Sequence, residues 1–262
     1  MSTIITDPSV VAQFASGIDK TVTVDTIPPL DTTVYLPGGL RLANGDIAKT
    51  AEVKELTGAD EEAISIIKNP GAKLNAVLER GVVKIGSITP GPIELDALLA
   101  GDRDALLLGI RRVTFGDTEP MSVVCTSCGV QQTVEINLSK DIDYVTFSES
   151  QITNTLSVQT KQGTLVLTYP NGVTQRKIAE AENKTTAELI TMIISGCIVS
   201  LNDAPVIGSA IALQLGLQDR NKIIKLISEG APGPRLGEVS KACEACGALI
   251  AVPLGLADLF RI

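Results

Sequence analysis

The sequence predicts an α+β protein built from two tandem, pseudo-symmetric halves, each with a hairpin, helices and a CxxC zinc knuckle. Matching segments recur in the same order in both halves, and each half ends in Cys-x-x-Cys-Gly. The content of 44% apolar and 20% charged residues is typical of a globular chain. We expect an extended N-terminal arm at 1–30, a first half at 31–140, a linker at 141–160 and a second half at 161–262.

The clearest match between the halves joins a helix start to a cysteine pair. Asp102-Arg103 corresponds to Asp219-Arg220, an offset of 219 − 102 = 117 residues. Cys125 corresponds to Cys243, an offset of 243 − 125 = 118 residues, so one inserted residue separates the two anchors. A single tandem duplication explains matches that keep the same order along the chain.

Two weaker matches lie upstream of these anchors. The segment 72–81 aligns with 187–196, and the segment 34–39 aligns with 167–172. This alignment leaves an extra stretch in the first half, near Leu56 to Pro70. We therefore expect the two halves to differ by an insertion at that place.

The order of elements is expected to be the same in each half. A hairpin comes first, with its turn at Pro37-Gly38-Gly39 or Pro170-Asn171-Gly172. A helix follows, and a second helix begins near each Asp-Arg pair, where an acidic residue suits the helix N-terminus. These pairs could be anion or partner sites, but a helix cap with a local ion pair is the plainer interpretation. A period-two strand is predicted at Thr133–Leu138, beside the first cysteine pair.

One helix of the second half has a strongly apolar face. Its apolar residues recur at helical spacing and are Leu189, Ile190, Ile193, Ile194 and Cys197. A free cysteine packs as a small hydrophobic residue, so Cys197 is assigned to the core. The predicted arm contains one short strand, at 21–27.

The four remaining cysteines form the candidate site: Cys125, Cys128, Cys243 and Cys246. A structural zinc ion takes four tetrahedral ligands, and one CxxC pair supplies two of them. Neither half can complete such a site alone, so the simplest solution is one zinc ion shared between the halves. The glycine after each pair, Gly129 or Gly247, allows a tight turn under the metal. Disulfides within or across the pairs remain an alternative that satisfies the same spacing.

Composition removes several classes of function. The chain has no histidine, which excludes Ser–His and Cys–His nucleophile pairs and a histidine-ligated catalytic zinc. The net charge of −8 and an aromatic content of 3% argue against nucleic-acid binding, including a zinc-ribbon module. No apolar run reaches the length of a membrane span, and no phosphate-binding loop is present. We expect neither an active site nor a small-molecule substrate.

Three parts of the sequence carry a resemblance to a known family. They are the run LPGGLRLANGDIAKTAEVKELTGADEE, the run LLAGDRDALLLGIRRVTFGDTEPMSVVCTSCGVQQTVEINL and the run GPRLGEVSKACEACGALIAVP. Together they resemble tailed-bacteriophage baseplate proteins, described as hub or wedge proteins or as hub assembly factors. The likeness covers about residues 31–253. It brings no catalytic residues, and the four knuckle cysteines carry over as zinc ligands.

The resemblance implies a mechanical role. The expected function is a structural component of the tail baseplate, with other tail and baseplate proteins as partners in a symmetric assembly. The expected location is the virion, and the host cytoplasm during assembly. A non-virion assembly factor, or a redox or zinc-handling protein of another kind, is the alternative.

Overall fold

The structure is a computed structural model that describes residues 31–148, 155–181, 183–252 and 254–260. The predicted N-terminal arm, with its strand at 21–27, lies outside the described residues. Among the described helices, none is long and apolar enough to cross a membrane.

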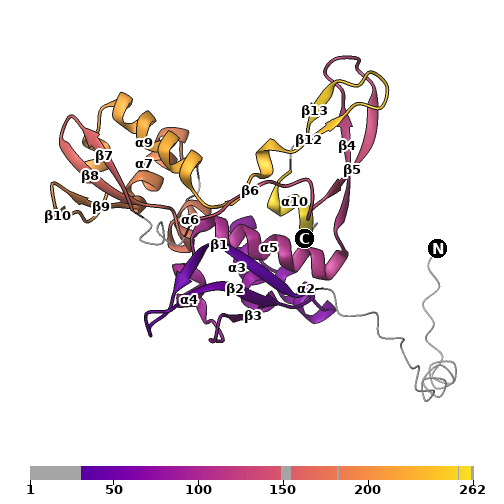
Figure 1. The fold of residues 1–262 in the computed structure, drawn as a ribbon, viewed down its shortest axis with the longest axis horizontal. Helices are drawn as coiled ribbons and strands as arrows, with labels where there is room; N and C mark the ends of the chain where they lie inside the picture. Colours follow the sequence, from indigo (N-terminus) through magenta and orange to yellow (C-terminus); the bar gives the residue numbers. More distant parts are fainter. Residues whose placement is uncertain (1–30, 149–154, 182, 253, 261–262) are drawn as a thin grey trace. The chain divides into compact units, whose positions relative to one another are not determined.

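The first half consists of a three-stranded sheet, four helices and a projecting hairpin (Figure 1). The antiparallel sheet has the order β1-β2-β3, and the hairpin pairs β4 with β5. In chain order the elements are β1 (Thr33–Arg41), β2 (Ile47–Val53), α2 (Gly58–Ser65), α3 (Pro70–Gly81), β3 (Val82–Ile85), α4 (Pro92–Ala97), α5 (Ala100–Phe115), β4 (Thr118–Val124) and β5 (Gln131–Asn137).

The second half repeats this order with one added edge strand, giving the sheet β10-β9-β8-β7. A short strand, β6 (Tyr144–Val145), lies between the halves and pairs with β11. The other elements are β7 (Thr155–Thr160), β8 (Gly163–Thr168), α6 (Gly172–Glu180), α7 (Thr186–Cys197), β9 (Ile198–Leu201), β10 (Ala204–Pro205), α8 (Ala210–Gln214), α9 (Leu217–Gly230), β11 (Gly233–Pro234), the 3-10 turn η2 (Leu236–Glu238), β12 (Ser240–Ala242), β13 (Leu249–Ala251) and α10 (Leu256–Phe260). The segment predicted as a linker, 141–160, therefore contains β6 and β7.

Strand register shows that the halves are equivalent in detail. Ala51 pairs with Ile85 between β2 and β3, and the register shifts between Glu52 and Val53. Leu165 pairs with Leu201 between β8 and β9, and the register shifts at the same point of that ladder. The predicted α+β class with two pseudo-symmetric halves is thus confirmed.

The predicted position of the hairpin turns is wrong in both halves. Pro37-Gly38-Gly39 lies inside β1, where the register shifts between Tyr35 and Leu40, and the turn falls at 42–46. Pro170-Asn171-Gly172 instead leads into α6, and the Asn171 side chain accepts a hydrogen bond from the Thr174 N–H at its N-terminus. The glycines meet different needs in the two cases: Gly39 has a φ of 80° in the bulge, whereas Gly172 allows the close approach of Asp96 and Arg103 at the start of α6.

This misplaced turn also produced a false insertion. The stretch near Leu56 to Pro70 contains α2, which corresponds to α6 in the second half. Both helices follow the second strand of the hairpin and precede the longer helix α3 or α7. The first half therefore holds no extra helix, and the correct alignment pairs β1 with β7 and β2 with β8.

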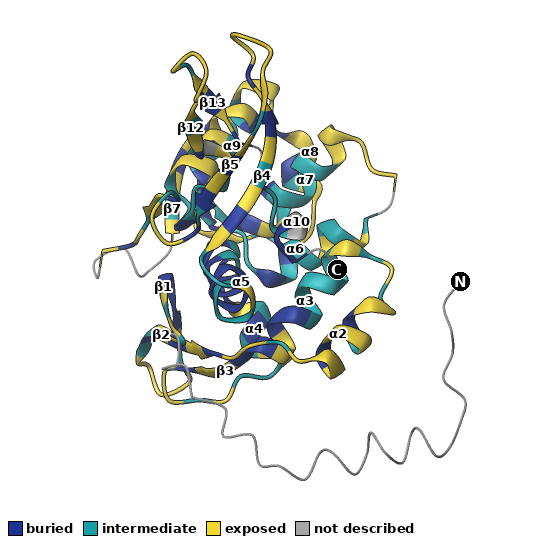
Figure 2. Ribbon diagram, turned by 90° about the vertical axis from the view of Figure 1, so that its right-hand side faces the viewer, coloured by how far each residue is buried: buried dark blue, intermediate teal, exposed yellow. Residues whose placement is uncertain are grey.

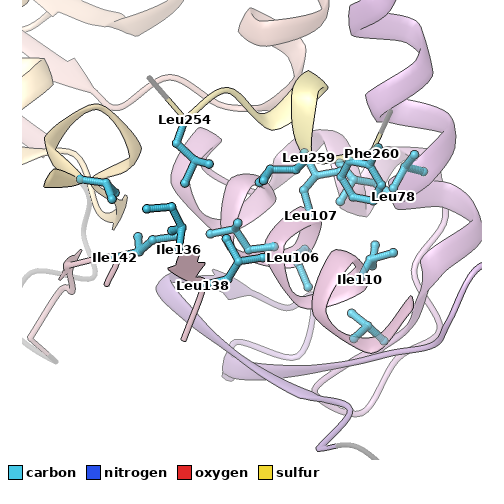
Figure 3. Packing of buried hydrophobic residues seen from close by; sticks show 14 of the residues in the cluster. Leu78, Leu106, Leu107, Ile110, Ile136, Leu138, Ile142, Leu254, Leu259 and Phe260 are labelled. Atoms are coloured by element: carbon cyan, nitrogen blue, oxygen red, sulfur yellow. The ribbon is translucent and has the colours of Figure 1, made fainter. Parts of the chain in front are cut away.

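The larger apolar core combines residues from both halves. It surrounds α5, whose residues 105–108 and 110 are buried (Figure 2). Leu254, Leu259 and Phe260 come from the C-terminal segment and pack against Leu106, Leu107 and their neighbours (Figure 3).

Polar contacts join the same C-terminal segment to α5. Arg111 Nε donates to the carbonyl of Leu259 at 2.8 Å, and its guanidinium forms a buried ion pair with Glu119 of β4. The second core lies between α7, α9 and the sheet of the second half. Cys197 is fully buried there, and desolvation raises the pKa of its thiol to about 12, as expected for a core residue.

Candidate metal centre

Each CxxC pair lies in the turn of a two-stranded hairpin. In the first hairpin the N–H of Cys125 donates to the carbonyl of Val130 at 2.9 Å, and the N–H of Gly129 donates to the carbonyl of Cys125 at 2.8 Å. In the second hairpin the N–H groups of Cys243 and Gly247 make the equivalent bonds, both at 2.8 Å. The backbone thus forms the same knuckle twice.

The glycine of each knuckle has the role predicted for it. Gly129 and Gly247 both have φ of 73°, a left-handed conformation that L side chains rarely adopt. No heavy atom lies within 4 Å of a Cβ placed on either glycine. Backbone conformation alone, and not crowding, therefore requires glycine at these two positions.

The two knuckles bring all four cysteine sulfurs together. The sulfurs of Cys125 and Cys246 are 3.7 Å apart, as are those of Cys128 and Cys243. All four lie within 4.8 Å of one another. A tetrahedral zinc site with Zn–S bonds of about 2.3 Å places its sulfurs about 3.8 Å apart, whereas a disulfide needs about 2.05 Å. The four thiols are free in this structure, and their spacing fits a metal ion.

The environment of the sulfurs differs between the two positions of each pair. Cys125 and Cys243 are buried, and Cys128 and Cys246 are exposed. Hydrogen bonds from the backbone N–H groups of Cys128 and Ser127 lower the pKa of Cys125 to about 6. Thiolate is the form that binds metal, so these N–H groups prepare Cys125 as a ligand.

Polar contacts outside the four ligands also join the knuckles. The Gln132 side-chain oxygen on β5 accepts from the Cys243 thiol at 3.4 Å and from the Glu244 N–H at 3.2 Å. Lys241 of β12 pairs with Asp141 at 2.6 Å, beyond the end of β5. Sequence reasoning missed these contacts, because no spacing rule links a glutamine or a lysine to a partner about 110 residues away.

The Asp-Arg pairs are placed at helix starts as predicted, with each aspartate in the first turn, but the predicted capping role is wrong. The helices begin earlier, with Leu99 and Gly216 as N-caps, so neither aspartate is the capping residue. Asp102 Oδ1 instead accepts from the Gly38 N–H of β1 at 2.7 Å. Arg103 makes no ion pair with Asp102; it bonds the carbonyl of Leu95 at 2.7 Å.

A further finding comes from comparison with known proteins. The family described as T4 bacteriophage base plate protein matches residues 42–261, which include both knuckles. No curated protein and no solved structure matches the chain. The match covers most of the sequence, so it reaches every element of both halves except β1.

Proposed function

Because the chain belongs to the family of T4 bacteriophage base plate proteins, we propose that it is a structural component of the tail baseplate whose two knuckles share one zinc ion. The family places the protein in the virion tail, in association with other tail proteins. Hub and wedge are the two positions within the baseplate that this proposal allows.

The convergence of four sulfurs from distant knuckles is the observation that carries the zinc assignment. Cys128 and Cys243 are separated by 115 positions, yet their sulfurs lie 3.7 Å apart. When bound, zinc supplies a tetrahedral cross-link with no redox chemistry of its own. The chain contributes the four thiolates, the N–H groups that stabilise them, and the Gln132 contact that positions the second knuckle against the first.

The proposed role is mechanical and not enzymatic. The chain has no histidine, and the four cysteines face one another and not a substrate cavity. A cross-link of this kind keeps the projecting hairpins β4–β5 and β12–β13 together while neighbouring proteins bind. We propose that tail proteins are the partners, with no nucleic acid, membrane or small-molecule substrate.

Two measurements test the proposal. Mass spectrometry of purified virions is expected to detect the chain; its absence from virions would refute the component role and favour an assembly factor. Metal analysis of the purified protein is expected to give one zinc per chain, with thiols that react only after chelation. Zinc-free protein whose cysteines cycle between thiol and disulfide would instead support a redox protein.

A further inference from the structure

The α6 helix joins the two halves by packing against both. Along the chain of helix contacts, α2 packs on α3, α3 packs on α6, and α6 packs on α7. Because α2 corresponds to α6 and α3 corresponds to α7, this is a stack in which short and long helices alternate, with α6 between α3 and α7. The stack has two open ends within the described chain: the outer face of α2 and the outer face of α7.

The contact between α3 and α6 shows how the short helix of the second half packs on the long helix of the first half. Arg103 Nε donates to Gln175 Oε1 at 2.8 Å, and Arg176 forms an ion pair with Asp96 of α4. A Cβ added to Gly71 would overlap Ala179, so the two backbones approach closely. The cavity beside Arg176 and Asp96 measures about 70 Å³, and a second cavity beside Arg176 and Gly71 measures about 160 Å³.

The equivalent face of the second half has no such helix on it. The offset between α3 and α7 is 186 − 70 = 116 residues, which pairs Gly71 with Ala187. Ala187 is exposed, whereas Gly71 is half-buried. Leu213 occupies the position of Asp96 and is 66% exposed. Here the cavity measures about 470 Å³, which is larger than either cavity beside Arg176.

The outer face of α2 is likewise left uncovered by the other described helices. The offset between α2 and α6 is 172 − 58 = 114 residues, so Glu61, Glu62 and Ser65 correspond to Gln175, Arg176 and Ala179. All three α2 residues are exposed (Figure 2), whereas their α6 counterparts are half-buried against α3.

Charge at these two open ends is complementary, and its sign is reversed relative to the internal contact. Inside the chain a basic residue, Arg176, pairs with Asp96 in a cavity that Glu79 and Arg103 also line. At the open end the cavity is lined by Lys177 and by Lys184, which forms an ion pair with Glu188 at 2.9 Å, while α2 carries Glu61 and Glu62. An acidic helix therefore fits the open cavity.

We propose that the α7 face binds α2 of a second copy of this chain, in the way that α3 binds α6 within one copy. Such an interface is heterologous, since it joins different faces of the two copies, and it leaves one free α2 and one free α7 face on each dimer. The copies can therefore add head to tail, and they form a ring if the rotation between them closes. This inference is independent of the zinc site.

Sedimentation velocity of the full chain at several concentrations tests the proposal. We expect concentration-dependent association that Ala187→Arg on the acceptor face, or Glu62→Lys on the donor face, weakens by about tenfold or more. Thr133→Arg, on an exposed position of β5, is the matched control and should leave association unchanged. Leu213→Asp, which places a like charge opposite Glu62, and Ser65→Arg provide a second variant of each face, should the first alter the thermal melt.

Mixing the two variants gives the sharpest result. A187R keeps an intact α2, and E62K keeps an intact α7 face, so the mixture should form a one-to-one dimer that grows no further. A chain that stays monomeric up to about 100 μM overturns the proposal. Association that none of these variants weakens would also overturn the proposal. Association that requires residues 1–30 and persists in A187R would do the same, because either outcome places the contact elsewhere.

Discussion

Replacing Cys243 by serine removes one of the four sulfurs and should release the second knuckle from the first. Cys243 is 2% exposed and belongs to the larger core, together with Ile250 and Val252. The cross-link closes a loop of 115 residues between Cys128 and Cys243. Because the unfolded chain has no formed site, zinc binds the folded chain alone and stabilises it by about 4 kcal/mol when free zinc is about 1,000 times Kd. That is a large part of the about 5–15 kcal/mol by which domains are stable.

We therefore expect C243S to lose zinc and about 4 kcal/mol of unfolding free energy at that zinc concentration, measured by denaturant titration and metal analysis. Hydrogen exchange should then rise in β4–β5 and β12–β13 together, because each hairpin holds the other in place. Cys197→Ser is the control: it also alters a buried cysteine, but it should retain one zinc per chain. Loss of protection confined to β12–β13, or full stability without zinc, would refute the shared site.

Three further predictions concern the knuckle turns, a buried ion pair and a buried acid. Gly129→Ala should lower the free energy of unfolding by about 1–2 kcal/mol, because alanine is strained in the left-handed backbone conformation of Gly129. Gly237→Ala is the control: Gly237 is also in open space but has no positive φ, so the loss should be smaller. Equal shifts in denaturation midpoint would contradict this account. Arg111→Met should cost about 3–5 kcal/mol by breaking the buried ion pair with Glu119, and the double variant with Glu119→Gln should recover part of that loss in the same titration. Burial raises the pKa of Asp102 to about 6 from its usual value of 3.8, so the folded state binds this proton more tightly than the unfolded state. The contribution of Asp102 to stability is then greatest at low pH and falls by up to about 3 kcal/mol as pH rises from 4 to 7. This decrease of the unfolding free energy with pH should be absent in Asp102→Asn. An unchanged decrease in that variant would show that Asp102 is not its source.

Sequence reasoning reached the fold class and the knuckles because both depend on local signals that occur twice. The CxxCG turn needs a glycine with positive φ, and that requirement appears in the sequence at Gly129 and Gly247. The Asp-Arg pairs also located the starts of α5 and α9 to within a few residues. Duplication then allowed each assignment to be checked against its copy.

The errors arose where one residue pattern serves two structures. Pro-Gly-Gly and Pro-Asn-Gly both suggest a hairpin turn, yet one is a bulge in β1 and the other begins α6. Long-range contacts were also beyond reach. The hydrogen bond between Gln132 and Glu244, and the packing of Leu259 on α5, depend on how the halves come together, which no local pattern records.

The packing of the C-terminal segment on α5 has a consequence for synthesis of the protein. Residues 254–260 complete a core whose central helix is translated about 150 residues earlier. Domains usually fold from the N-terminus as they leave the ribosome, but this core stays open until Leu259 and Phe260 have emerged. A chain that stops short of Leu254 would display Leu106 and Leu107 to solvent and become a substrate for chaperones and proteases. Stable folding of the larger core thereby depends on a segment that is synthesised after both knuckles.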